Sequence, residues 1–207
     1  MNAGSGHIRV AVLGAGVIGR SLAGRWREAG HDVTLGVREP GRSDVVEFAA
    51  SIGAEAATIR DAVRASDAVL FAIRGSAVDE VLATTPELDG KIVIDATNDT
   101  SGPQLNHVAA IASAAPAAQV FRAFNSVGWE NFVDPDYDGI AGDLLYCGPD
   151  GEARAVVEAL IGATGLRPVR VGDREALGIV DAMTRLWFAL AFQQGWGRGV
   201  GFKILTR

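Results

Sequence analysis

The chain has 207 residues, of which 48% are hydrophobic and 21% charged, and this composition is sufficient for one sizeable buried core. Its high aliphatic content excludes a disordered chain, because burial of such side chains offsets the entropy cost of folding. The net charge of −6 excludes a nucleic-acid-binding surface built on bulk positive charge.

The compartment is predicted from the cysteine content and from the absence of targeting signals. Cys147 is the single cysteine, so no internal disulfide can form and we expect a reducing compartment, the cytoplasm. Its place in an apolar strand is typical of an unreactive core thiol. The longest apolar run, residues 186–192, is far shorter than the roughly 20 residues of a membrane-spanning helix. Residues 1–6 lack the basic start of a secretion signal, so we expect neither a membrane span nor secretion.

The first half of the chain alternates between two hydrophobic patterns. Apolar runs predict strands at residues 8–13, 32–37, 68–73 and 91–97, and four-residue spacing predicts helices at 17–29, 44–51 and 77–83. A weaker strand at 54–58 and a helical turn at 59–65 complete the series. Strands buried on both faces and separated by helices predict a Rossmann-type α/β fold, a doubly wound parallel sheet.

The second half is expected to extend this sheet. It contains a predicted helix at 104–114, a strand at 120–125, a loop to residue 142, strands at 144–147 and 168–171, a helix at 152–163 and a long helix at 175–194. A glycine-rich tail follows at 195–201. With no long linker, we expect one domain over residues 1–207, with a nucleotide-binding core at 1–119 and an extension at 120–207 for the acceptor side of the site.

The strongest motif is a G-x-G-x-x-G sequence between the first strand and the first helix. In this position it is typical of a dinucleotide site, with the helix N-terminus offering N–H groups to the phosphates. The first glycine permits the tight turn, the second lets the backbone approach a pyrophosphate, and the third allows close packing of the helix on the sheet. Its residues are Gly14, Ala15, Gly16, Val17, Ile18 and Gly19.

The end of the second predicted strand favours NADP over NAD. An NAD site carries Asp or Glu at this point to hold the ribose 2′-hydroxyl, whereas this strand ends in Val37 and Arg38. Arg38 can pair bidentately with a 2′-phosphate, and Arg42 is a second candidate. Glu39 favours the alternative, NAD, if the strand continues by one or two residues.

Polar residues follow three further strands at the edge where open α/β sheets bind ligands. Thr97 and Asn98 follow one strand, and Asn125 and Ser126 follow the next; they are predicted to orient the nicotinamide amide and ribose, or to serve only as turn formers. Ile73 and Arg74 end a strand at the same edge, where Arg74 is predicted to contact a phosphate or the substrate, or to lie in solvent.

Other motifs are weaker. Residues 134–139 imitate the start of a calcium loop, but Leu145 stands where the bidentate Glu is required. The histidines lack metal-ligand spacing, so no metal site is expected. No residue stands out as a proton donor for ketone reduction, which favours hydride exchange with a ring that delocalises the charge. Trp129, Trp196 and the glycine-rich tail are candidates for the surface that binds such a ring, with core packing as the alternative for the tryptophans.

Four segments carry a family resemblance: Ile-Asp-Ala-Thr-Asn at 94–98, Arg-Ala-Phe-Asn-Ser at 122–126, Tyr-Cys-Gly at 146–148 and the ending at 197–205. They resemble the NADP oxidoreductases that use coenzyme F-420, an 8-hydroxy-5-deazaflavin, and the related nucleotide-binding domain of the STEAP metalloreductases. The resemblance implies that Gly14, Gly16 and Gly19 hold the pyrophosphate and Arg38 the 2′-phosphate. It also places Asn125 near the nicotinamide, and Val200 and Gly201 beside the deazaflavin.

The chain departs from the deazaflavin enzymes at two points. Arg74 stands where they usually have proline, and Asn125-Ser126 replaces their His-Thr. The Ala-Phe-Asn form is closer to the metalloreductase branch.

The leading hypothesis is an NADP(H)-dependent oxidoreductase that transfers hydride between the nicotinamide and a deazaflavin, a flavin or another small acceptor. Its substrate-side residues are Ser126, Trp196, Val200 and Gly201. An anionic acceptor is expected, because the chain after Asp181 has no acidic residue and four basic ones, although a chance cluster of solvated side chains is the alternative.

Two other hypotheses stay open. One is an NADPH-dependent reductase of an imine or carbonyl metabolite with Tyr137, His107 or Lys203 as proton donor. The other is an NADP(H) sensor without turnover. In each case, the apolar run at 186–192 predicts a homodimer.

Overall fold

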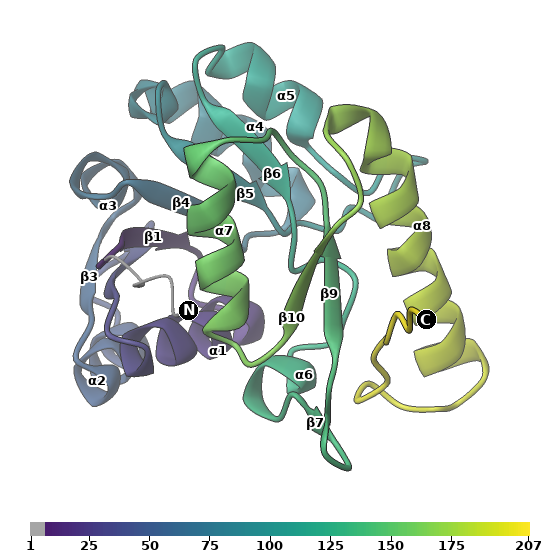
Figure 1. Ribbon diagram of the computed structural model, residues 1–207. Coiled ribbons are helices and arrows are strands. Elements are labelled where there is room, and N and C mark those ends of the chain that lie inside the picture. The colour runs from purple at the N-terminus through teal and green to yellow at the C-terminus, as the bar shows by residue number, and fades with distance from the viewer. Residues whose placement is uncertain (1–6) are drawn as a thin grey trace.

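A six-stranded parallel sheet forms the centre of the protein in the computed structural model, which describes residues 7–207 (Figure 1). Residues 1–6, on which the expectation about secretion rests, lie outside the described residues. The strand order β3-β2-β1-β4-β5-β6 confirms the Rossmann-type fold, because it joins two mononucleotide-binding halves between β1 and β4. The strands are β1 (Arg9–Leu13), β2 (Asp32–Val37), β3 (Glu55–Thr58), β4 (Ala68–Phe71), β5 (Ile92–Asp95) and β6 (Gln119–Arg122).

Helices cover both faces of this sheet. In β1 the side chains of Val10 and Val12 contribute to one hydrophobic core, and those of Ala11 and Leu13 contribute to the other. The first core includes residues from α1 (Val17–Glu28), α2 (Ser43–Ile52), α6 (Glu130–Val133) and α7 (Glu152–Gly162). The second includes residues from α3 (Ile59–Ala65), α4 (Val78–Thr84) and α5 (Val108–Ala114). Burial on both faces explains the continuous apolar run in β1.

The predicted C-terminal strands are present as β9 (Asp143–Tyr146) and β10 (Arg167–Arg170), with α7 between them. They pair with each other in parallel, and an antiparallel bridge between Arg122 and Cys147 links them to β6. The two halves of the chain share a core, in which the indole of Trp26 donates a hydrogen bond to the carbonyl of Leu160 at 2.8 Å. Cys147 is buried, as predicted, and burial raises the pKa of its thiol to about 12.

Several predicted boundaries were wrong. The strands expected to reach residues 73 and 97 end at Phe71 and Asp95. The helix expected from residue 104 begins at Val108, because the preceding loop folds onto β5, where the N–H of His107 donates to the Asp95 carboxylate at 2.7 Å. The strand expected to reach residue 125 ends at Arg122, and Phe124 follows with a φ of 63°. The expected loop to residue 142 contains α6 and a hairpin of β7 (Asp136–Tyr137) and β8 (Ile140–Ala141). Positive φ angles at Asp138 and Gly139 form its turn, as two-residue hairpins require.

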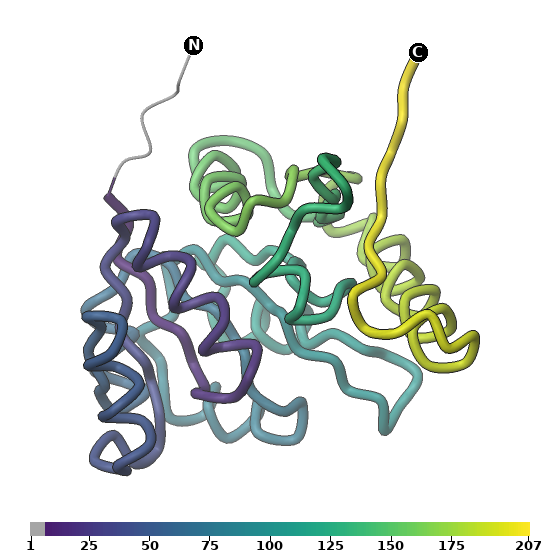
Figure 2. The backbone as a smooth tube through the Cα atoms, turned by 90° about the horizontal axis from the view of Figure 1, so that it is seen from below, coloured from purple at the N-terminus to yellow at the C-terminus, as the bar shows by residue number. Residues whose placement is uncertain are grey.

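The long C-terminal helix is present but is not uniformly α-helical. It begins with a 3₁₀ turn (Arg174–Ala176), continues as α8 (Leu177–Phe188) and ends in a π-helical turn (Ala189–Gln193). Figure 2 shows α8 and the tail, in yellow, on the opposite side of the molecule from β2, β3 and α2. Within residues 7–207, no helix combines the length and the apolar content that crossing a bilayer requires.

Candidate functional site

A cleft of about 840 Å³ opens at the carboxyl ends of β1, β2, β3 and β4. It lies where the strand order reverses, between β1 and β4, and this is where open α/β sheets bind ligands. The predicted residues that line the cleft are Gly14, Ala15, Gly16, Val37, Arg38, Arg42, Ile73 and Arg74. Val17, Ile18 and Gly19 form the first turn of α1 and are not part of this lining.

The glycine turn has the geometry that a bound diphosphate requires. Gly14 has a φ of +100°, and a Cβ there would lie 2.6 Å from the carbonyl oxygen of Ala72. At Gly19 a Cβ would overlap the carbonyl of Gly14, whereas open space lies next to Gly16. No side chain caps the start of α1, so its first N–H groups are free for a ligand. These residues therefore fit a dinucleotide.

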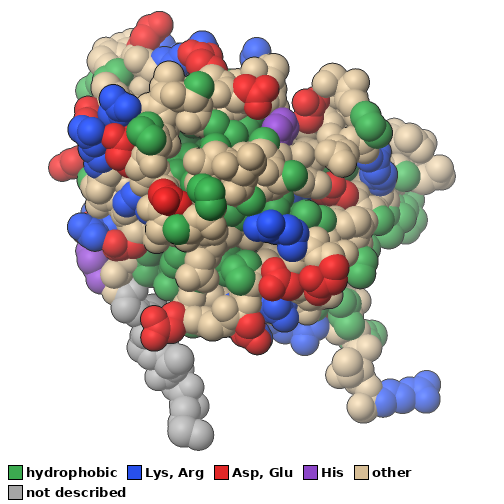
Figure 3. Space-filling view, turned by 90° about the horizontal axis from the view of Figure 1, so that it is seen from above, with side chains coloured by type: hydrophobic (Ala, Val, Ile, Leu, Met, Phe, Trp, Pro, Cys, Tyr) green, Lys and Arg blue, Asp and Glu red, His purple; other side chains and the backbone are tan. Residues whose placement is uncertain are grey.

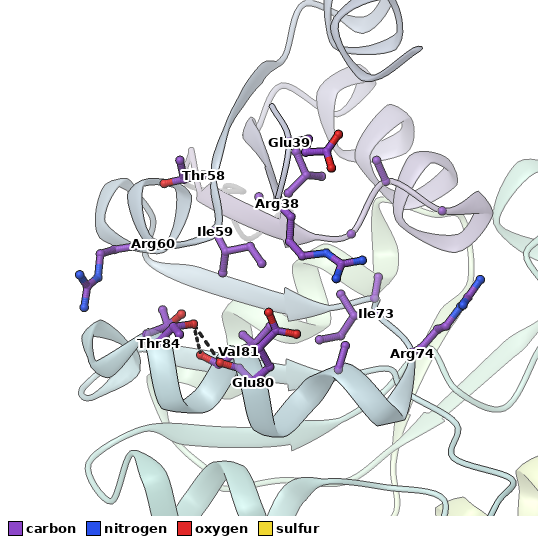
Figure 4. Close-up of a pocket in the computed structure, with 18 of the residues that line it drawn as sticks. Arg38, Glu39, Thr58, Ile59, Arg60, Ile73, Arg74, Glu80, Val81 and Thr84 are labelled. Carbon is purple, nitrogen blue, oxygen red and sulfur yellow. Dashed lines mark hydrogen bonds between the residues drawn. The ribbon is translucent and has the colours of Figure 1, made fainter. Parts of the chain in front are cut away.

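Two arginines of the cleft, Arg38 and Arg74, have guanidinium groups that make neither an ion pair nor a hydrogen bond with any of residues 7–207. Arg42, by contrast, pairs with Asp44 at 2.5 Å, and this hydrogen bond raises the pKa of Arg42. In Figure 4 the Arg38 guanidinium extends toward Ile73, whereas the Glu39 carboxylate points away from it. The cleft thus presents an uncompensated guanidinium at the position expected for a 2′-phosphate.

Sequence reasoning missed two groups of cleft residues. Thr58 ends β3, and Ile59 and Arg60 follow it; the apolar pattern of this short strand is weak, so the sequence gives little indication of its carboxyl end. Glu80 and Thr84 line the cleft from α4, where their spacing of four places them on one face of the helix (Figure 4). Ligands bind at the carboxyl ends of the strands in open α/β sheets, and this rule indicates the residues after β3. Helical periodicity indicates the residues of α4.

The polar residues after β5 belong to a buried hydrogen-bond network outside this lining. Asp95 is fully buried and accepts hydrogen bonds from the N–H and the hydroxyl of Thr97, at 2.9 and 2.6 Å. The Thr97 hydroxyl lies 2.9 Å from Nδ1 of His107. Because that hydroxyl donates to Asp95, Nδ1 of His107 is the donor in this bond. The Thr97 side chain is therefore occupied within the protein.

Arg122, which sequence reasoning did not select, is the centre of this network. Its side chain is fully buried and pairs with Asp95 at 3.5 Å and with Asp181 of α8 at 3.1 Å. It also donates to the carbonyl of Thr97 and, at 2.9 Å, to Oδ1 of Asn98. The sequence did contain a signal for this pair: two apolar strands each end in a charged residue, Asp95 and Arg122. Because buried charges occur in pairs, these two residues could have been predicted to contact each other.

The turn after β6 is buried as well. Asn125 is 2% exposed and donates to the Thr184 hydroxyl at 2.6 Å, and Ser126 is fully buried. Oδ1 of Asn125 and Oγ of Ser126 have no hydrogen-bond partner within residues 7–207. Of the four polar residues predicted at this edge, Asn98 is the one that keeps partial exposure. Direct ligand contact by Asn125 and Ser126 therefore stays a prediction.

Residues 9–99 match the family described as NADP oxidoreductase coenzyme F420-dependent. The resemblance to this family is confirmed. The chain is also 29% identical over 180 residues to the metalloreductase STEAP3 of Rattus norvegicus. That match covers 84% of this chain and 36% of the rat protein, so the chain spans much less than the whole of this relative.

Two solved structures extend the comparison. A candidate F420-dependent NADP-reductase from Arthrobacter sp. FB24 superimposes with a TM-score of 0.84 at 25% identity, over 96% of this chain and 100% of that one. A reductive aminase from Aspergillus terreus, in complex with NADPH and ethyl levulinate, gives a TM-score of 0.69 at 25% identity, over 89% of this chain and 62% of that one. The chain is thus similar to NADP-dependent oxidoreductases along most of its length.

The segment that resembles the C-terminus of the F-420-dependent enzymes lies outside the cleft lining. Trp196 is 67% exposed, and the carbonyl of Val200 accepts a hydrogen bond from the Trp187 indole at 2.8 Å. Gly201 packs against Tyr137, whose ring leaves no room for a Cβ. The structure therefore does not bring Trp196, Val200 and Gly201 together with the glycine turn, and their acceptor-side roles stay predictions.

The three candidate proton donors lie in different environments. Tyr137 is in the hairpin, and burial, followed by the charge of Asp134, raises the pKa of its hydroxyl to about 12. Lys203 pairs with Asp143 at 3.2 Å and donates to the carbonyl of Ala141 at 2.7 Å. His107 lies at the carboxyl edge of β5, where its Nε2 is 3.9 Å from the Asp99 carboxylate. Of the three, His107 is the one at the ligand-binding edge of the sheet.

Proposed function

We propose that this protein is an NADP(H)-dependent oxidoreductase that transfers hydride between the nicotinamide and a deazaflavin, such as coenzyme F-420, a flavin or another small acceptor. The observation that carries the proposal is the unpaired Arg38 guanidinium beside a glycine turn shaped for a diphosphate. The family match over residues 9–99 supports it.

Different residues of the cleft would bind different parts of the cofactor. The N–H groups at the start of α1, together with Gly16, would hold the pyrophosphate, and Arg38 would hold the 2′-phosphate. NADP is favoured over NAD, because the Glu39 carboxylate points away from the region that Arg38 enters. The nicotinamide supplies the hydride when bound, and the protein contributes its position and the exclusion of water.

The C-terminal segment is proposed as the acceptor side. Of its basic residues, Arg198 and Lys203 pair with Glu130 and Asp143, at 2.6 and 3.2 Å. Arg185 and Arg207 have no carboxylate partner in the described part of the chain. They leave positive charge at this end of the protein, which supports an anionic acceptor.

Mixing the purified protein with NADPH and oxidised F-420 in a stopped-flow instrument tests the proposal. We expect the visible absorbance of F-420 to fall as NADPH is consumed, and FMN and riboflavin in parallel arms report whether a flavin replaces the deazaflavin. Tight NADPH binding without oxidation by any acceptor would favour a sensor. Failure of calorimetry to detect binding of either nicotinamide nucleotide would overturn the proposal.

A second candidate function is NADPH-dependent reduction of an imine or carbonyl. His107 favours it, because this imidazole lies at the ligand-binding edge of the sheet. The similarity to a reductive aminase with bound NADPH agrees with this alternative. The test replaces F-420 with a cyclic imine. If the protein then oxidises NADPH and His107→Ala does not, imine reduction is favoured over deazaflavin reduction.

A further inference from the structure

One face of α8 is hydrogen-bonded to the polar loops that end β5 and β6. Oδ1 of Asp181 accepts a hydrogen bond from Nε of Arg122 at 3.1 Å, and Oδ2 accepts from Asn106 at 2.7 Å. Three residues later, the hydroxyl of Thr184 accepts from Nδ2 of Asn125 at 2.6 Å. A spacing of three places Asp181 and Thr184 on the same side of the helix.

Both of these connections lead to Asn98. Arg122 donates to Oδ1 of Asn98 at 2.9 Å, and Nδ2 of Asn98 donates to the carbonyl of Asn125 at 2.9 Å. The two ends of the Asn98 carboxamide are therefore fixed by different neighbours, and each neighbour is held by α8. Arg122 and Asn125 are buried, whereas Asn98 is partly exposed at the ligand-binding edge.

We propose that Asp181 and Thr184 of α8 are positioning residues that fix the Asn98 carboxamide for the nicotinamide half of NADP(H). This inference rests on the proposed function, because it assumes that the cleft binds NADP(H). A buried arginine stays in place only if its charge is balanced, and Asp181 supplies that balance together with Asp95. The side-chain positions at the carboxyl end of β5 thus depend on a helix that is distant in sequence. The hydrogen-bonded residues Asn106 and Asp181, for example, are 75 residues apart.

Calorimetry with two ligands tests this on the full-length protein. NADPH occupies both halves of the site, whereas 2′,5′-ADP carries the adenosine and 2′-phosphate but no nicotinamide. In Thr184→Val the acceptor for Asn125 is lost while the side-chain shape is kept. We expect the Kd of NADPH to rise about tenfold and that of 2′,5′-ADP to stay unchanged. Thr184→Ser, which retains the hydroxyl, should restore the affinity.

Thr164→Val is the matched control. Thr164 is also a fully buried threonine, and its hydroxyl donates to the carbonyl of Ile161 at 2.7 Å, next to α7 and away from this network. We expect no change in either Kd for this variant. A general loss of packing would weaken both ligands in Thr184→Val, and that outcome would overturn the proposal.

Asn98→Ala provides a second test that keeps the ion pairs of Arg122 and the hydrogen bond between Asn125 and Thr184. It should raise the Kd of NADPH and leave that of 2′,5′-ADP unchanged; unchanged affinity for both ligands would refute a role of Asn98 at the nicotinamide. If the unmodified protein binds neither ligand, the proposed function fails. If it binds both and the variants lose no selectivity, only the positioning role fails.

Discussion

At the scale of single residues, we expect the charge of Arg38 to decide which nucleotide the cleft prefers. Its guanidinium lines the cleft without a partner in the described part of the chain, whereas Arg42 is paired with Asp44. An unpaired guanidinium gains most from a group with two negative charges, and among the nicotinamide nucleotides only NADP(H) carries the 2′-phosphate.

We therefore expect Arg38→Ala to raise the KM for NADPH roughly 10- to 100-fold, which corresponds to the loss of a charge-assisted hydrogen bond, and to change the KM for NADH little. Initial rates with both nucleotides measure the effect. Arg25→Ala is the control, because this arginine pairs with Glu28 at the end of α1, outside the cleft lining. An equal effect of Arg38→Ala on both nucleotides would exclude its role at the 2′-phosphate.

Arg74 differs from Arg38 in its position. It follows β4 on the other side of the sheet reversal and, in Figure 4, its guanidinium points away from that of Arg38. We expect Arg74→Ala to raise the Kd of NADPH and of NADH by the same factor, roughly tenfold, because the diphosphate is common to both nucleotides. Calorimetric titration with each nucleotide measures it. A loss of affinity for NADPH alone would indicate that Arg74 contacts the 2′-phosphate instead.

At the scale of elements, one buried carboxylate fixes the C-terminal tail to β9. Asp143 is 1% exposed and accepts hydrogen bonds from Arg167 at 2.8 and 2.7 Å and from the N–H of Ile204 at 2.7 Å. Lys203 adds an ion pair at 3.2 Å. Burial by itself would raise the pKa of Asp143, but these donors outweigh it and lower the pKa from the ordinary 3.8 to about 2.

This shift predicts how stability depends on pH. Because the folded pKa lies below the unfolded one, Asp143 stabilises the protein above about pH 4, and its contribution of about 2 kcal/mol is lost as the pH falls toward 2. In Asp143→Asn we expect lower stability at neutral pH and a shallower loss of stability between pH 4 and 2. Urea unfolding at several pH values measures both, with the exposed turn variant Asp138→Asn as control. An unchanged slope would show that the carboxylate is not the linked group.

The elements also show which features the sequence could predict. The alternation of buried strands and amphipathic helices predicted the succession of β1 to β6 along the chain, because burial on both faces leaves a continuous apolar run. The glycine turn was predictable because its conformation is restricted to glycine. The later start of α5 was not, since it depends on Asp95 accepting from His107, a contact between different elements. The same applies to Arg122, whose partners are distant in sequence.

At the scale of the whole molecule, the solvent-exposed face of α8 carries more large apolar side chains than an ordinary exposed helix face. Ile179 and Leu186 are 54% and 45% exposed, and Ala182 lies between them at helical spacing. Phe192 adds a further exposed ring, at 55%, in the π-helical turn. Figure 3 shows hydrophobic side chains gathered along the right-hand margin, the side on which Figure 1 places α8. A continuous apolar stripe of this kind is typical of an interface between subunits.

We propose that a second copy of the chain covers this stripe, since two-fold pairing is the commonest closed assembly. Sedimentation velocity should then give a dimer whose fraction rises with concentration. Leu186→Asp should weaken the dimer at least about a hundredfold, because it buries an unpaired charge. Val133→Asp, at a 55% exposed position on α6, should leave the dimer unchanged. Because α8 and the β2 side of the cleft lie on opposite sides of the molecule, the Leu186→Asp monomer should still bind 2′,5′-ADP. A wild-type protein that stays monomeric at every concentration contradicts the pairing.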